Sequence, residues 1–344
     1  MNEKPMKRKM FISPLLAVIA FSLPAQAHQA GQHNANTHAP IGVMGDHTHG
    51  KGEFMMSYRY MNMSMSGVGM GNNDLSTLQV LDTYMMSPIE MDMSMHMLGF
   101  MYAPTDRLTL MAMINHSEKE MTMQNRMGMR FNTSSSGSSD TKLGALYRLK
   151  NWNNNHLHLN MGLSLPTGSI NTKDDTPMGE NVILPYGMRL GSGTYDVNLG
   201  LTWNQYHEGH AFGAQVMSTI RTGENDADYR LGHENQLNAW ASKNVSDSWS
   251  FSARLEAKNK QSIKGSDGRL MMMANMNMTP GANADFSGGN WLNLGLGVNF
   301  ISNSTGMFNG HRFGLEYKVP LLEDLAGIQM QGDKVWTVGW QKAF

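Results

Sequence analysis

Methionine is the residue whose abundance and spacing first point to chemistry in this chain. The sequence holds 34 methionines in 344 residues and no cysteine, and 20 of the methionines fall between Met44 and Met129. Many recur as Met-x-Met pairs, and a spacing of two places neighbouring thioethers on one face of a strand, about 7 Å apart. Soft thioethers select Cu(I) and Ag(I) over hard cations. The candidate metal ligands are Met61, Met63, Met65, Met111, Met113, Met121, Met123, Met127 and Met129.

Histidines form a second group of candidate ligands. Residues 28–52 are polar, show no periodicity and contain His28, His33, His38, His47 and His49. We predict a flexible N-terminal segment here. His47 and His49 are candidate ligands beside the methionines, and the alternative is that a histidine pair in a flexible tail is incidental. We expect no required cofactor, with Cu(I) or Ag(I) as the ions to be bound.

The competing interpretation of the methionines is packing, in which they face lipid or fill gaps. Within 91–97 the opposite face carries Asp92, Ser94 and His96, which predicts that Met91, Met93, Met95 and Met97 face lipid. Within 53–65 and 107–116 other apolar residues occupy the lipid face, so Met61, Met63, Met65, Met111 and Met113 turn inward. We expect Met121, Met123, Met127 and Met129 beyond the membrane edge, toward an outer loop.

The elements that carry these residues alternate apolar and polar side chains. Twelve such segments are present, at 53–65, 91–102, 107–123, 140–150, 156–166, 193–206, 209–222, 233–244, 247–260, 290–301, 310–319 and 333–344. Each has roughly the length that a tilted strand needs to cross a bilayer. The connections alternate between long and short, which is typical of outer-membrane barrels, whereas a soluble β-sandwich has no reason to alternate loop length.

We therefore predict an all-β fold, a transmembrane antiparallel up-and-down β-barrel of about 12 strands with long outer loops and short periplasmic turns. Residues 185–190 could extend a strand, which leaves a range of about ten to fourteen strands. The last segment places Trp336, Val338, Trp340 and Phe344 on one face. This terminal-Phe strand resembles the signal by which bacterial outer membranes accept their barrels, so we expect the barrel-assembly machinery to be a partner.

The ends and the composition define the compartment. Residues 1–27 have a basic start, a short apolar run and a small-x-small site at Ala25-Gln-Ala27, which predicts a signal peptide. Residues 28–52 then form the flexible segment and residues 53–344 the barrel. We expect the outer membrane of a Gram-negative bacterium, with lipid and small solutes or metal ions as partners. The net charge of -1 indicates no nucleic-acid binding.

Charged residues on the expected inner face define a pore wall. About twelve strands leave a narrow lumen, which a loop or the N-terminal segment could plug. The inward charges would pair with one another or select solutes. They are Arg59, Lys142, Arg148, Arg221, Arg254, Glu256, Lys258, Glu316 and Lys318.

Three stretches resemble a family of outer-membrane barrels that are described as transporters and grouped under a phenol meta-pathway name. They are 164–169 (Ser-Leu-Pro-Thr-Gly-Ser), 184–196 (Leu-Pro-Tyr-Gly-Met-Arg-Leu-Gly-Ser-Gly-Thr-Tyr-Asp), and 41–47 (Ile-Gly-Val-Met-Gly-Asp-His) followed by 57–61 (Ser-Tyr-Arg-Tyr-Met). The last pair is similar to a methionine-rich branch. The resemblance implies a barrel and transport, and it supplies no catalytic residues.

The sequence predicts a narrow channel for small solutes, linked to copper or silver through the methionine and histidine clusters. One alternative is a Cu(I)- or Ag(I)-binding outer-membrane protein without transport. The other is an outer-membrane hydrolase with a Ser-His-Asn site, for which Asn115-His-Ser117 is the nearest arrangement. The chain has no Gly-x-Ser-x-Gly elbow, so we expect a protein that is not an enzyme.

Overall fold

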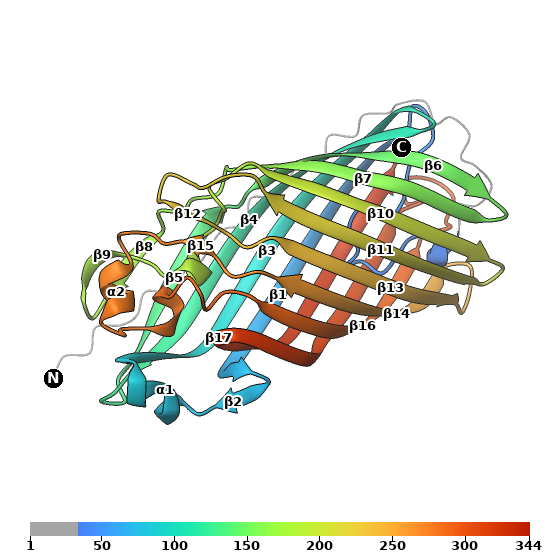
Figure 1. Ribbon diagram of the computed structural model, residues 1–344. Helices are drawn as coiled ribbons and strands as arrows, with labels where there is room; N and C mark the ends of the chain where they lie inside the picture. The colour runs from blue at the N-terminus through green and yellow to red at the C-terminus, as the bar shows by residue number, and fades with distance from the viewer. Residues whose placement is uncertain (1–33) are drawn as a thin grey trace.

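The computed structural model describes residues 34–344, so the expected signal peptide, 1–27, lies outside the described residues. Its main feature is an antiparallel sheet in which each strand pairs with the next and the last pairs with the first (Figure 1). The members are β1 (Phe54–Gly71), β3 (Met86–Thr105), β4 (Leu108–Asn125), β6 (Thr141–Trp152), β7 (Asn155–Leu165), β10 (Asp196–His207), β11 (His210–Arg221), β13 (Glu234–Asn244), β14 (Trp249–Lys260), β16 (Gly289–Ile301) and β17 (Arg312–Ala343). Closure leaves no sheet edge in lipid.

The last element, β17, supplies two strands of the barrel wall. Its first arm pairs with β16 as far as Leu325, and its second arm pairs with β1. The chain reverses near Gly327, which has a φ of 85°, and the Tyr317 and Trp336 rings then lie 4.4 Å apart. Ten other strands and these two arms make the expected twelve. The strands expected at 310–319 and 333–344 are both longer than predicted, because pairing continues almost to the turn. Recognition of this strand by assembly machinery stays a prediction.

Long and short connections lie at opposite ends of the barrel, which we name the loop end and the turn end (Figure 1). The loops between barrel strands carry β2 (Asn73–Leu75), α1 (Thr77–Thr83), β5 (Arg130–Ser138), β8 (Lys173–Thr176), β9 (Gly179–Ile183), η2 (Tyr186–Met188), β12 (Tyr229–Arg230), β15 (Lys264–Gly265), α2 (Met271–Asn275) and η3 (Pro280–Ala282). Within residues 34–344, no helix is long and apolar enough to cross a membrane.

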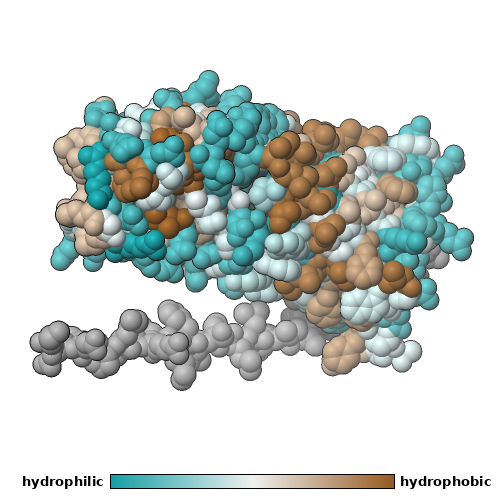
Figure 2. All heavy atoms as spheres, turned by 90° about the horizontal axis from the view of Figure 1, so that it is seen from below, coloured by the Kyte–Doolittle hydropathy of each residue, from teal (hydrophilic) through white to brown (hydrophobic). Residues whose placement is uncertain are grey.

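Side chains alternate between the two faces of the wall, as the sequence pattern predicts. On β14, Phe251 and Leu255 are exposed while Ser252, Arg254 and Glu256 are buried. On the face shown in Figure 2, hydrophobic side chains gather in a band across the barrel, with hydrophilic surface on both sides. Such a band is what the bilayer covers in an outer-membrane barrel.

The long loops pack together over the loop end. Ile183, Tyr186, Tyr229, Ile263, Leu270, Met273 and Ala282, from three different loops, form one hydrophobic cluster. The buried Asp267 carboxylate accepts hydrogen bonds from Arg189, at 2.7 Å, and from Arg269, also at 2.7 Å. These contacts lower the pKa of Asp267 to about 2, although burial alone would raise it. The loops thus have a core and an ionic clamp of their own.

The N-terminal segment, expected to be flexible, is docked inside the barrel from Asn34 onward. It begins with η1 (Ala35–Thr37), and residues 34–52 are named the plug. Inner-wall side chains bind its backbone carbonyls: His158 and Asn160 contact Gly45, Asn204 contacts Asp46, and Gln215 contacts Met44. The barrel wall therefore supplies the packing that the segment lacks by itself.

We expect deletion of residues 34–50 to raise the single-channel conductance in planar bilayers, because these residues fill the lumen at the turn end. Heat-modified migration in gels would show that the barrel still closes. A synthetic peptide of residues 34–50, added to the deletion variant, should lower the conductance again. An unchanged conductance would mean that the wall or the outer loops close the lumen.

We expect Asp267→Asn to loosen the loop end, because two guanidinium groups lose their shared carboxylate. Since folding depresses the pKa of Asp267 from 3.8 to about 2, its contribution is complete above pH 3.8 and is lost as the pH falls toward 2. Tryptic cleavage after Arg189 and Arg269 should speed up about tenfold at neutral pH. Asp285→Asn, in the same loop, is the control. Equal cleavage rates in the two variants would contradict the clamp.

Candidate metal-binding lumen

Methionines of β1, β3 and β4 meet in register on the inner face of the barrel. Met61, Met63 and Met65 on β1 pair with Met95, Met93 and Met91 on β3, and Met91 pairs in turn with Met121 on β4. Directly paired residues in an antiparallel sheet have Cβ atoms about 4.5–5.5 Å apart. We name the whole set the methionine lattice: Met55, Met61, Met63, Met65, Met91, Met93, Met95, Met97, Met101, Met111, Met113, Met121 and Met123.

The lattice corrects one expectation, since Met91, Met93, Met95 and Met97 face the lumen and not lipid. Met97 pairs with Arg59, whose guanidinium contacts Met44 of the plug. The outward face of β3 carries Asp92, Ser94 and His96, which pair with Glu120, Glu118 and His116 of β4. Toward the loop end the outer face of a strand meets water instead of lipid, so polar residues there no longer mark the inner face.

The other predicted methionines divide into two groups. Met111, Met113, Met121 and Met123 lie on the inner face of β4 as part of the lattice. Met127 and Met129 lie at the turn between β4 and β5, with 86% and 48% of their surface exposed. The structure therefore does not bring these last two into the lumen.

A cavity of about 450 Å³ lies beside the lattice at the loop end, and we name it the outer cavity. Its thioether side consists of Met63, Met65, Met91, Met93, Met121 and Met330. The loop residues Leu184 and Met188 pack against Met91, and Lys119 donates hydrogen bonds to the carbonyls of Gly187 and Arg189. The sequence did not identify Met330 as a lumen residue, because Met330 lies between the expected strands 310–319 and 333–344. Its pairing with Val68 of β1 brings it to the cavity.

The predicted pore-wall charges lie inside the barrel, and most of them are paired. Arg254 binds Glu256 and Glu316, while Lys318 binds Glu256 at 2.7 Å. Lys258 binds Glu234 at 3.1 Å, and Arg221 binds Asp196. Arg148 donates to Thr48 of the plug, whereas Lys142 is exposed to the lumen. Glu234 and Asp196, which pair with these charges, were missed.

A second cavity, of about 480 Å³, lies at the turn end, and we name it the inner cavity. His38, His47 and His49 of the plug line it, together with His156 and His158 of the wall. Burial lowers the pKa of His49 despite its hydrogen bond to Glu53. His47 and His49 are thus separated from the loop-end methionines. A small space lined by Met44, Met55, Met101, Met111 and Met113 also touches His47.

The segment Asn115-His-Ser117, the nearest arrangement to a Ser-His-Asn hydrolase site, has its side chains on two different faces of β4. Asn115 and Ser117 are buried on the inner face, and His116 is exposed on the outer face. Ser117 bonds Ser139, and His116 lies 3.3 Å from Ser136. Alternation along β4 therefore keeps the imidazole away from the serine with which it would have to work.

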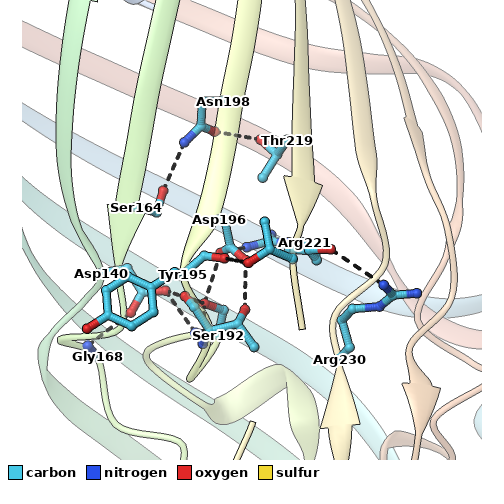
Figure 3. Close-up of polar contacts among 12 residues, drawn as sticks. Asp140, Ser164, Gly168, Ser192, Tyr195, Asp196, Asn198, Thr219, Arg221 and Arg230 are labelled. Atoms are coloured by element: carbon cyan, nitrogen blue, oxygen red, sulfur yellow. Dashed lines mark hydrogen bonds and ion pairs between the residues drawn. The ribbon is translucent and has the colours of Figure 1, made fainter. Parts of the chain in front are cut away.

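The motif at 184–196 builds a polar network at the loop end of the wall (Figure 3). The Asp140 carboxylate accepts hydrogen bonds from the Gly168 and Ser192 backbones, and Asp196 accepts from Ser192 and Arg221. A Cβ at Gly191 would lie 2.3 Å from the Gly168 carbonyl oxygen, so the two backbones can approach only as glycines. The motif fixes a loop to the barrel.

The comparisons with known proteins agree with this architecture. Residues 97–317 match the family described as the MetA-pathway of phenol degradation. No curated protein is significantly similar to the chain in sequence. An outer membrane channel from Pseudomonas putida F1 has a similar fold, with a TM-score of 0.62, 14% sequence identity, and coverage of 88% of this chain and 100% of that one. The transport unit of the autotransporter AIDA-I from Escherichia coli matches with a TM-score of 0.47, 10% identity, and coverage of 89% and 93%.

The similarity at 14% identity shows the fold, a closed β-barrel like that of an outer membrane channel. The family match starts within β3 and ends within β17, so it includes the motifs at 164–169 and 184–196 and confirms the resemblance to the family. The motifs at 41–47 and 57–61 lie outside the matched residues, and the similarity to a methionine-rich branch stays a prediction. Because that match covers more than half of the 344 residues, the chain belongs to the phenol-degradation MetA-pathway family of outer-membrane barrels.

Proposed function

We propose that this protein is an outer-membrane channel whose methionine lattice binds Cu(I) or Ag(I) and passes these ions along the lumen. The observation that supports the proposal is the register of β1, β3 and β4, which gathers thioethers on a face that lipid cannot reach. Elsewhere the inner wall is polar, with Asn160, Thr202 and Gln215 buried on it. A soft, weakly hydrated cation is the ligand that such a surface suits.

The lattice extends from the outer cavity toward the plug. Met65, Met63 and Met61 follow one another on β1, with about 7 Å between successive side chains on one face. Deeper along the barrel, Met113, Met101 and Met55 approach Met44 of the plug around a shared small space. Each thioether is a weak neutral ligand, so an ion held by two or three of them can exchange to the next group. The lattice can therefore serve as a path as well as a store.

A second candidate is passage of a small apolar organic solute. The outer cavity is lined by Trp291, Phe286 and Ile328 in addition to its methionines, and an apolar guest would gain from the same walls. Methionine in that case acts as an adaptable packing residue. Replacement of sulfur by carbon at constant volume separates the two functions, since only the metal requires the thioether.

We expect leucine substitution of Met63, Met65, Met91, Met93 and Met121 together to lower the Cu(I) stoichiometry of the folded barrel in a titration against a competing chelator. Leucine keeps the volume and apolarity and removes the sulfur. The matched control replaces five exposed methionines by leucine, Met70, Met271, Met272, Met276 and Met307, and should bind as the parent protein does.

Equal losses in the two variants, or no loss in either, would show that the lattice is packing. Binding without transport is the remaining alternative. It predicts a normal titration together with no Ag(I) entry into liposomes that contain the barrel lacking residues 34–50.

A further inference from the structure

Three imidazoles of the plug gather at the inner cavity. The His38 and His47 ring centroids lie 4.0 Å apart, and those of His47 and His49 lie 4.8 Å apart. Ligand atoms of His38, Asp46 and His47 all fall within 4.8 Å of one another. The sequence places these residues in two short stretches, which the wall of the barrel holds together.

Two of the rings are oriented by carboxylates. His47 Nδ1 lies 2.9 Å from Asp46 Oδ1, and His49 Nδ1 lies 3.2 Å from Glu53 Oε2. The other Asp46 oxygen accepts the backbone N–H of Ala39 at 2.9 Å. A carboxylate on one ring nitrogen fixes the tautomer and leaves the other nitrogen with its lone pair available, which is how metal-binding histidines are commonly supported.

The free nitrogens are buried. His38 Nδ1, His47 Nε2 and His49 Nε2 have no hydrogen-bond partner among residues 34–344, and His49 as a whole exposes 2% of its surface. Buried polar atoms are normally satisfied, whereas these three nitrogens lack a partner on rings whose centroids are 4.0 Å and 4.8 Å apart in succession. The neighbouring His158 differs, since its Nε2 lies 2.9 Å from the Gly45 carbonyl oxygen.

We propose that His38, His47 and His49 bind one divalent transition-metal ion, Cu(II) more tightly than Zn(II), with Asp46 and Glu53 as positioning residues. Neutral imidazole suits both ions, and copper exceeds zinc in the usual order of affinities. The inner cavity gives access from the turn end. This site is distinct from the methionine lattice in donor type and in place, so each can fail without the other.

The test uses the full-length mature barrel in detergent, without a histidine tag, stripped of metal and titrated with Zn(II) and with Cu(II) against a chelator. Zn(II) does not report on the methionine lattice, because thioethers select softer ions. One Zn(II) per barrel is expected, and the electron paramagnetic resonance spectrum of bound Cu(II) should show coupling to three nitrogens. That spectrum needs no variant and therefore does not depend on how a substituted plug folds.

Substitution of His38, His47 and His49 by Gln should weaken Zn(II) binding more than about 100-fold, and Asp46→Asn should weaken it about 10- to 100-fold with the ligands intact. The control is His96→Gln with His116→Gln, on the outer face, which should leave affinity unchanged. Less than one Zn(II) per barrel, coupling to one nitrogen or none, or unchanged binding by the triple variant would each overturn the proposal.

Discussion

In-register antiparallel pairing both closes this barrel and determines which side chains face its lumen. A barrel in lipid must satisfy every backbone group within its own wall, and the closure between β17 and β1 does so. Once that register is set, alternation decides which side chains face the lumen. The same pairing that satisfies β1, β3 and β4 therefore aligns their methionines across the wall. The lattice follows from the barrel and needs no further structural device.

The lumen is divided between two chemistries. At the loop end, loops with their own hydrophobic cluster and ionic clamp cover a cavity rich in thioethers. At the turn end, the plug fills the barrel and presents imidazoles to a polar cavity. Paired charges such as Arg254 and Glu316 line the wall, and a Cβ on Gly42 of the plug would lie 2.3 Å from the Glu316 carboxylate. Thioether donors thus lie at the loop end of the lumen, and imidazole donors lie nearer the turn end.

The sequence predicts the barrel, its twelve strands and the inward charges, because alternation and loop length are local properties of the chain. It fails where a residue's environment changes along one strand. The polar residues Asp92, Ser94 and His96 predicted that their side of β3 faces the lumen, but they lie on the outer face, above the lipid. The pairing of Met97 with Arg59 shows instead that the methionine side of β3 faces the lumen. His38 and Met330 could not be predicted for a related reason: contacts between residues far apart in sequence decide their positions. The same contacts hold the plug, which the sequence indicates only as one of two ways to fill the lumen. The chain reversal near Gly327 was likewise hidden between the two expected strands.

The soft-cation site proposed for the lattice can be observed by anomalous diffraction from crystals of the barrel soaked in silver nitrate. Anomalous peaks are expected within the outer cavity, each between thioethers of neighbouring strands such as Met65, Met91 and Met121. Silver found only at exposed methionines such as Met127, with none beside the lattice, would contradict the proposed site.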